Sequence, residues 1–205
     1  MSSLLQGWPL VGVASAALLA LQLAILAVAG TEEPGLRELV RVSARASFSI
    51  FLLVFVARPS RVFWPGRFTR WLVRNRRQLG VSFAVAHFLH LFDIALLALL
   101  LGDAFEINPL TLYVGGLSYV LLAAMTATSF DGSARWLGPR RWKRLHRAGL
   151  YLLWFIFAQN WTLSALEEPG YIPLALAAWG ALALRIAAWR ARRAGAAEPA
   201  RLHAA

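Results

Sequence analysis

The sequence contains no cysteine and carries little charge. Without cysteine the chain can form no disulfide, no iron–sulfur cluster and no thiolate zinc site, so any metal must bind through histidine or carboxylate. Only 15% of the residues are charged and 59% are hydrophobic. The mean hydropathy is +0.58, which is more apolar surface than a soluble domain can bury. We therefore expect lipid to be the solvent for much of the chain.

Long apolar runs predict the fold class. Backbone polar groups in lipid must bond to one another, which restricts spanning segments to helices or closed barrels. The runs here are much longer than the roughly 10 residues of a barrel strand, so we predict an all-α, polytopic membrane bundle with six transmembrane helices. The expected spans are residues 9–29, 45–56, 79–101, 110–129, 142–166 and 171–189.

Proline and glycine punctuate the connections between these spans. Pro34-Gly35, Pro65-Gly66 and Gly138-Pro139 are turn signals, and Pro59 is interpreted in the same way, as the end of the short second span. We expect residues 1–190 to form a single transmembrane domain and residues 191–205 to be a basic, disordered cytoplasmic tail. The first eight residues carry no positive charge, so the N-terminal run is expected to stay as a span rather than be cleaved.

The formal net charge of +11 is explained by topology rather than by nucleic acid. Basic residues gather in the connections after the second, fourth and sixth spans, whereas most acidic residues lie in the opposite connections, with Arg37 and Arg41 as exceptions. The positive-inside rule therefore places both termini in the cytoplasm of a multi-pass protein of the inner (plasma) membrane. The basic residues that define this side include Arg58, Arg61, Arg67, Arg70, Arg74, Arg76, Arg77, Arg135, Arg140, Arg141, Lys143, Arg144, Arg147, Arg190, Arg192 and Arg193.

Three of the four histidines lie within or at the edge of a predicted span. His87 and His90 are in the third span, one helical turn apart on one face, and His146 is at the cytoplasmic start of the fifth. Ionisable groups in lipid are costly and are usually functional. Imidazole is the usual axial ligand of a low-spin haem iron, so one histidine from each span can bracket a porphyrin between facing helices. His203 lies in the tail.

Other polar residues near these histidines have two readings each. Asp93, three residues beyond His90, either accepts the Nδ1 proton of a ligand or makes a polar contact within the bundle. Arg45 either reaches a haem propionate or extends to the interface. Gln159 and Asn160 either bridge helices or meet a quinone head group. The histidines themselves also suit plain interhelical hydrogen bonds, and no His-Glu-x-x-His run supports a zinc site.

Two blocks of sequence carry a resemblance to a known family. The first is Arg76-Arg77-Gln78-Leu79-Gly80 leading to His90, and the second runs from Asp131-Gly132-Ser133 through Leu137-Gly138-Pro139 to Leu145-His146. Over about residues 35–190 the chain resembles the ferric reductase-like transmembrane family, which includes the haem-binding membrane subunit of bacterial methionine sulfoxide reductase and the membrane core of NADPH oxidases.

The resemblance implies haem irons bound by histidines of the third and fifth spans, with His90 and His146 as ligands and His87 as a further candidate. The chain departs from the family where Gln159 stands at the expected place of an outer histidine, so one haem b is expected rather than two. Family members that carry a fused flavin and NADPH domain have no counterpart of it here, which implies a separate electron donor, either a flavin reductase or a quinol. Nothing in the sequence indicates bound FMN.

These observations predict an integral membrane electron-transfer protein, the membrane subunit of an oxidoreductase. It would pass electrons through haem b to ferric iron or to a periplasmic redox partner, with membrane lipid around it and no nucleic-acid partner. The alternative is a cofactor-free membrane protein, such as a small transporter or assembly partner, whose histidines relay protons or pack helices.

Overall fold

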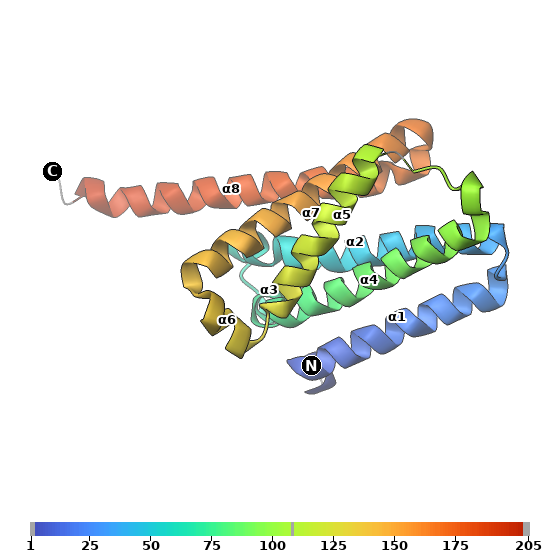
Figure 1. Cartoon of the computed structure of the whole chain (residues 1–205). Helices are drawn as coiled ribbons and strands as arrows, with labels where there is room; N and C mark the ends of the chain where they lie inside the picture. Colours follow the sequence, from blue (N-terminus) through green and yellow to red (C-terminus); the bar gives the residue numbers. More distant parts are fainter. Residues whose placement is uncertain (1–2, 108, 203–205) are drawn as a thin grey trace. The chain divides into compact units, whose positions relative to one another are not determined.

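The computed structural model describes residues 3–107 and 109–202, and 91% of the chain is helical with no strand in the described part (Figure 1). This confirms the all-α class. The long apolar runs become α-helices joined by short connections, two of which contain a 3₁₀ turn, and a third 3₁₀ turn precedes α1. In chain order the elements are η1 (Ser3–Leu5), α1 (Trp8–Ala29), α2 (Glu33–Phe63), α3 (Arg67–Arg74), α4 (Arg76–Leu101), η2 (Gly102–Ala104), α5 (Pro109–Ala127), α6 (Asp131–Leu137), α7 (Pro139–Glu167), η3 (Pro169–Tyr171) and α8 (Ile172–Leu202).

Four helical segments of the described chain are long and apolar enough to cross a membrane: Trp8–Ala29, Glu33–Phe63, Arg76–Ala104 and Pro169–Ala194. A fifth is formed if α5 and α6, which meet at an angle of 109°, count as one broken span. The most apolar stretch of α1 has no buried residue, so its side chains face the surroundings rather than a protein core. Helices of this length and exposure are those of a membrane protein.

The helix α7 is not among these segments, although the sequence predicts a span there. Its first turns carry several basic residues, and Gln159 and Asn160 interrupt its apolar part. Both features lower the apolar character that a spanning helix needs.

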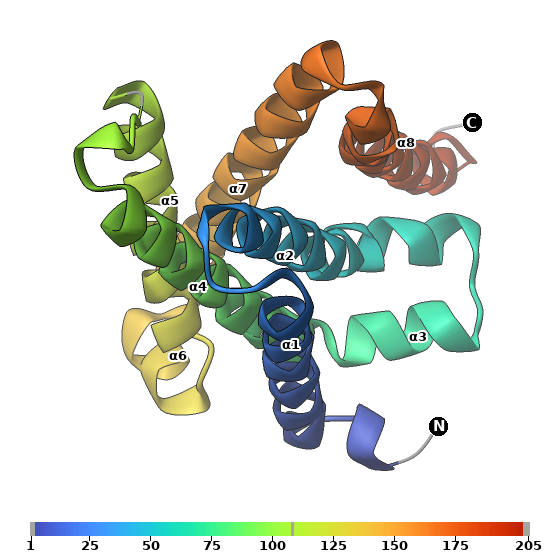
Figure 2. The ribbon, with the colours of Figure 1, turned by 90° about the vertical axis from the view of Figure 1, so that its right-hand side faces the viewer.

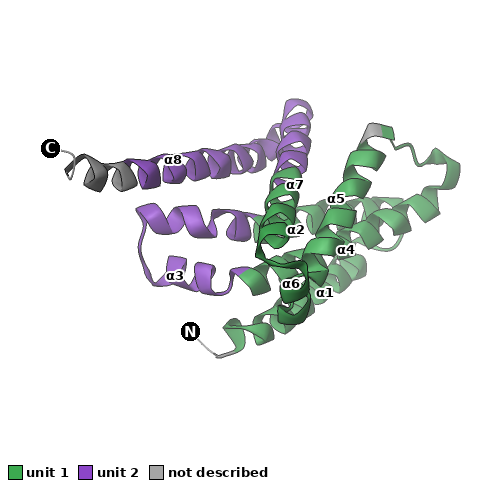
Figure 3. Ribbon diagram, turned by 60° about the vertical axis from the view of Figure 1, so that its left-hand side comes forward, with its two compact units in different colours: residues 1–51, 77–153 green, residues 52–76, 154–205 purple. Residues whose placement is uncertain are grey.

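Contacts divide the chain into two compact units (Figure 3). Unit 1 contains residues 1–51 and 77–153, and unit 2 contains residues 52–76 and 154–205. The boundaries fall inside or at the first turn of α2, α4 and α7, which are continuous helices, so no linker in the sequence marks them.

Within unit 1, α4 is the central helix. It contacts α1 through Gln22, α2 through Ser43 and Ser47, and α5 through Tyr119 (Figures 1 and 2). The adjoining core contains a cluster of Leu36, Leu39 and Leu97, together with Phe48 and Phe51, which have no exposed surface. The α4 face that carries the histidines therefore lies against other helices, away from lipid.

Within unit 2, the second halves of α2 and α7 pack against α8. Phe55 of α2 is fully buried and its ring stacks near Trp154 of α7, with centroids 6.4 Å apart. The indole Nε1 of Trp154 donates to the carbonyl of Ala178 in α8 at 2.9 Å. The buried Trp154 of α7 thus contacts both α2 and α8.

The second span differs from the sequence prediction. α2 runs over 31 residues, from Glu33 to Phe63, and Pro59 lies inside it rather than at its end. The expectation that Pro59 ends the helix is wrong: the Phe55 carbonyl, which the proline leaves without an N–H donor within α2, accepts from Nη1 of Arg185 in α8 at 2.7 Å. Arg45 consequently lies near the middle of a long helix instead of at the outward end of a short one.

The C-terminal helix also extends beyond the predicted span. α8 continues to Leu202 and so includes most of residues 191–205, for which the sequence predicts disorder. Alanine and arginine, which dominate that segment, have high helix propensity. His203 lies outside the described residues.

Candidate functional site

His87, His90 and Asp93 line one face of α4, and α2 presents two serines to it. Ser47 Oγ lies 2.9 Å from Nδ1 of His87, and Ser43 Oγ lies 2.9 Å from Nδ1 of His90. The two helices are antiparallel, so a step of four residues on α2 matches a step of three on α4. Each imidazole is therefore held through the same ring nitrogen by a hydroxyl of the neighbouring helix.

The tautomer of His90 depends on where the hydroxyl hydrogen of Ser43 goes. The Ser43 oxygen lies 3.2 Å from the carbonyl of Val40 and 2.9 Å from Nδ1 of His90, and the Asp93 carboxyl group is a third acceptor. When the hydrogen goes to either oxygen, Ser43 accepts from Nδ1–H of His90. The Nε2 atom of His90 then carries the lone pair, which is the form of imidazole that binds a metal.

His87 sits deeper in the bundle, with only 6% of its surface exposed. Its ring stacks on Tyr119 of α5, with centroids 4.7 Å apart and planes inclined by 17°, and lies 5.3 Å from the ring of Phe83. The ring of His90 is 5.7 Å away on the other side. This aromatic packing fixes the plane of the imidazole and excludes water from it.

Asp93 contacts Gln22 and not a histidine ring. Nε2 of Gln22, in α1, lies 2.9 Å from one carboxylate oxygen and 2.7 Å from the other. The side chain of Asp93 is 2% exposed, and α1 thereby provides a donor for a carboxyl group that would be costly to bury alone. Ser43 is the partner of His90 Nδ1, and Asp93 makes a polar contact within the bundle, one of the two roles that the sequence leaves open for it.

His146 lies in the second turn of α7 and is held by α5. Its Nε2 is 3.2 Å from Oγ1 of Thr128, and its ring stacks on Trp142 with centroids 4.1 Å apart. Thr128 donates its own hydroxyl hydrogen to the carbonyl of Ala124 at 2.7 Å, so it accepts from Nε2–H of His146. In this arrangement a metal at Nε2 of His146 would have to replace the Thr128 contact.

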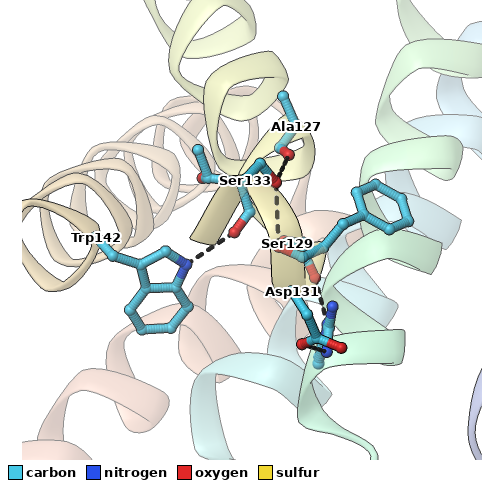
Figure 4. A network of polar contacts seen from close by, with 8 residues as sticks. Ala127, Ser129, Asp131, Ser133 and Trp142 are labelled. Carbon is cyan, nitrogen blue, oxygen red and sulfur yellow. Dashed lines mark hydrogen bonds and ion pairs between the residues drawn. The ribbon is translucent and has the colours of Figure 1, made fainter. Parts of the chain in front are cut away.

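The sharp turn between α5 and α6 supports this histidine (Figure 4). Nε1 of Trp142 donates to the carbonyl of Thr128 at 2.9 Å, and Ser133 Oγ donates back to the carbonyls of Ala127 and Phe130. Trp142 is therefore a positioning residue for His146.

The two sequence blocks that carry the family resemblance meet at this turn. Nη1 of Arg77 forms an ion pair with Asp131 at 2.8 Å, and its Nε donates to the carbonyl of Ser129 (Figure 4). The same guanidinium lies 5.3 Å from the ring centroid of Trp8. Arg77 thus links the start of α4 to the α5–α6 turn and to α1.

No three His, Asp or Glu side chains of the described residues gather to ligate one ion. A haem needs at most two protein ligands, on opposite faces of the porphyrin. His87 and His90 are one turn apart on one helix, so only one of them could serve a given iron, and a second ligand would have to come from another helix. The contacts of His146 described above are with Thr128 and Trp142 and not with either of these rings. Arg45 lies half-buried on α2, between Ser43 and Ser47 in the sequence.

Sequence reasoning missed the residues that orient the histidines. Ser43 and Ser47 are four residues apart on α2, a spacing that places both on one helical face, and this signal was available. The sequence gives no comparable signal for Gln22 and Tyr119, because their roles depend on how α1 and α5 pack against α4.

No family model matches the chain, and no solved structure matches it. The resemblance in the two sequence blocks is therefore supported by those residues alone.

Proposed function

We propose that this chain is a six-span protein of the inner (plasma) membrane, with both termini in the cytoplasm, that holds haem b for transmembrane electron transfer. The observation that carries the proposal is the contact of Ser43 Oγ with Nδ1 of His90 at 2.9 Å: with Nδ1–H as the donor, the Nε2 lone pair is left for iron. A hydrogen bond from the second ring nitrogen is the usual companion of a metal-bound histidine.

The chain's own residues would hold and shield the group. His90, or His87 in its place, supplies one axial nitrogen, and His146 supplies the other once it leaves Thr128. Haem b contributes one-electron transfer when it is bound. Ser43, Ser47 and Trp142 orient the three rings, while Tyr119 and Phe83 exclude water around His87.

The family resemblance implies the electron source and the acceptor. The donor in this proposal is a separate flavin reductase or a quinol, and the chain itself has no cysteine for an iron–sulfur cluster. The acceptor class is ferric iron or an oxidoreductase on the periplasmic side.

The second candidate is a cofactor-free bundle whose histidines pack helices or relay protons. The observation that favours it is that His87, His90 and His146 each already have a hydroxyl partner on a neighbouring helix. Interhelical hydrogen bonds of this kind stabilise membrane proteins by about 0.6 kcal/mol each on average.

An absorption spectrum separates the two candidates. We expect protein purified from haem-replete cells to show a Soret band and a reduced α-band. Replacing His90 or His146 with alanine should remove or shift these bands, and His203→Ala, which changes a histidine of the tail, is the control. A colourless wild-type protein that is folded and monodisperse favours the cofactor-free bundle.

A further inference from the structure

Asp93 is a buried acidic residue in a helical segment that is long and apolar enough to cross a membrane. It lies roughly 25 Å along the helix axis from Arg76 and roughly 16 Å from Ala104, the two ends of that segment. The residue is 2% exposed. An ionised carboxylate at such a depth loses its hydration, so it needs a cation or several strong hydrogen-bond donors.

The direct partners of the Asp93 carboxyl group are neutral. Within the described residues it bonds to the amide of Gln22 and to the hydroxyl group of Ser43. Gln22 belongs to α1, which carries no charged residue along its whole length. The helix that provides the closest contacts of Asp93 therefore provides no counter-charge.

The other helices packed on Asp93 carry titratable groups that point elsewhere. On α2, Arg41 and Arg45 lie two residues on either side of Ser43 and so about 200° around the helix from it. The histidines of α4 meet serine hydroxyl groups through Nδ1, and the tyrosine of α5 stacks on one of the two rings. In the described part of the chain, none of these groups is a hydrogen-bond or ion-pair partner of the carboxyl group. The titratable side chains of α4 and α5 on this side are His87, His90 and Tyr119.

A small cavity between α1, α2 and α4 lies beside the Asp93–Gln22 contact. Gln22 and Ser43 are its polar lining. The rest of its wall is apolar and includes Leu18, Leu21 and Leu89. Leu21 is 40% exposed, so this wall reaches the outer surface of α1. On this side one apolar helix separates the carboxyl group from the surroundings, which disfavours its charged form.

The side chain of Gln22 suits a carboxyl group in either protonation state. Its Nε2 lies 2.9 Å from one carboxyl oxygen and 2.7 Å from the other, the arrangement for a carboxylate that accepts. A half-turn of the amide brings Oε1 to the place of Nε2, at the distance of an O–H···O hydrogen bond. A protonated Asp93 then donates to Gln22, and its second oxygen remains an acceptor for Ser43. Neither helix has to move for this exchange.

We propose that Asp93 and Gln22 form a proton-binding site inside the membrane, in which the carboxyl group is protonated at neutral pH and donates to the amide. One neutral amide and one hydroxyl group do not offset the desolvation of a carboxylate, whereas they satisfy a carboxylic acid. Through Ser43 the bound proton lies one hydroxyl group away from Nδ1 of His90. The site therefore places an exchangeable proton beside the histidines, whether their rings bind haem or pack helices.

Infrared spectroscopy tests the protonation state, because the C=O stretch of a carboxylic acid is separate from the bands of carboxylates and of the backbone. The full chain, purified in a mild detergent, is compared at neutral pH with Asp93→Asn, which keeps the shape of the side chain. Asp131→Asn is the matched control, since the side chain of Asp131 is 80% exposed and pairs with Arg77 at 2.8 Å. Gln22→Leu tests the partner. The measurement reads the carboxyl group itself, so its outcome is separate from that of the haem spectrum.

We expect the wild-type protein to show the band of a buried carboxylic acid. Asp93→Asn should lose this band and Asp131→Asn should keep it. Gln22→Leu should shift it to higher frequency, because the acid loses a hydrogen-bond partner. A wild-type spectrum without the band overturns the proposal, and so does a band that survives in Asp93→Asn. An unshifted band in Gln22→Leu would exclude Gln22 as the partner.

If Asp93→Asn fails to fold, chemical labelling of the wild-type protein decides in its place. Dicyclohexylcarbodiimide enters the apolar phase, where the O–H of a protonated carboxyl group adds across one of its C=N bonds, and mass spectrometry of peptides identifies the labelled residue. Asp93 should take up this label in preference to Asp131, and a water-soluble carbodiimide should reverse the preference. A protein whose Asp93 stays unlabelled by the apolar reagent would sink the proposal.

Discussion

At the scale of single residues, the hydroxyl groups on α2 determine what the histidines can do. Ser43 and Ser47 each meet Nδ1 of a histidine at 2.9 Å, and both are buried. The side chains that bind iron in the proposal are therefore oriented by residues that carry no chemistry of their own.

Ser43→Ala tests this orientation. Removing the acceptor leaves the Nδ1–H of His90 without its partner, so we expect haem affinity to fall by about 10–100-fold, the usual effect of losing a hydrogen bond to a metal-bound histidine. Haem titration of the apoprotein measures the change. Ser49→Ala is the control, because Ser49 lies on the same helix but donates to the carbonyl of Arg45 at 2.8 Å. Equal affinities for the two variants would argue against His90 as a ligand.

At the scale of helices, the connection between α1 and α2 depends on a glycine. A Cβ at Gly35 would collide with the backbone carbonyls of Ala29 and Gly30, which cannot move without opening the turn. A Cβ at Gly149 would also collide, but with the sulfur of Met125, the flexible end of a side chain. A side chain at Gly35 therefore requires the backbone to move, whereas one at Gly149 requires only Met125 to move.

We expect Gly35→Ala to lower the free energy of unfolding by about 1–3 kcal/mol. Gly149→Ala should cost less than about 1 kcal/mol, because Met125 can change rotamer and alanine favours the helix. Unfolding of both variants in mixed micelles gives the comparison. A larger loss for Gly149→Ala than for Gly35→Ala would show that the α1–α2 turn is not held as the structure has it.

The bond between Arg185 and the Phe55 carbonyl can be tested through the proline that requires it. Arg185→Met should cost about 1–3 kcal/mol of unfolding free energy, because a buried carbonyl loses its donor. In a Pro59→Ala background the new N–H can bond to that carbonyl, so the same substitution should cost about 1 kcal/mol less. Arg192→Met, an exposed arginine of α8, controls for the loss of charge. Strict additivity of the two changes would contradict this account of Pro59.

These elements also show what the sequence could and could not predict. Apolar runs and flanking prolines predicted the helices, because both act locally. Pro59 was misjudged because its cost is offset by Arg185, more than a hundred residues away in the chain. The histidines were identified from their rarity in apolar segments, whereas Ser43, Tyr119 and Gln22 acquire their roles only when α2, α5 and α1 pack on α4.

At the scale of the whole molecule, the distribution of charge predicts six spans and a cytoplasmic location for both termini. The angle of 109° between α5 and α6 makes the fourth span the informative one, since such a pair either crosses the membrane or turns back within it. The chain has no cysteine, so single cysteines can be introduced without background labelling.

We expect Asp103→Cys and Glu167→Cys to react with a membrane-impermeant maleimide in right-side-out membrane vesicles. Arg135→Cys and Ala191→Cys should react only after the membrane is opened; all four positions are exposed. Labelling of Arg135→Cys from the outer side would mean that α5 does not cross, and that the six-span topology is incorrect.

The haem content of the purified protein tests the central claim most directly. The account predicts one haem b per wild-type chain purified from haem-replete cells, measured as the pyridine haemochrome against protein concentration. It predicts that the double variant His87→Ala/His90→Ala loses most of this haem. A folded wild-type protein without haem, or a double variant that keeps its full complement, would contradict it.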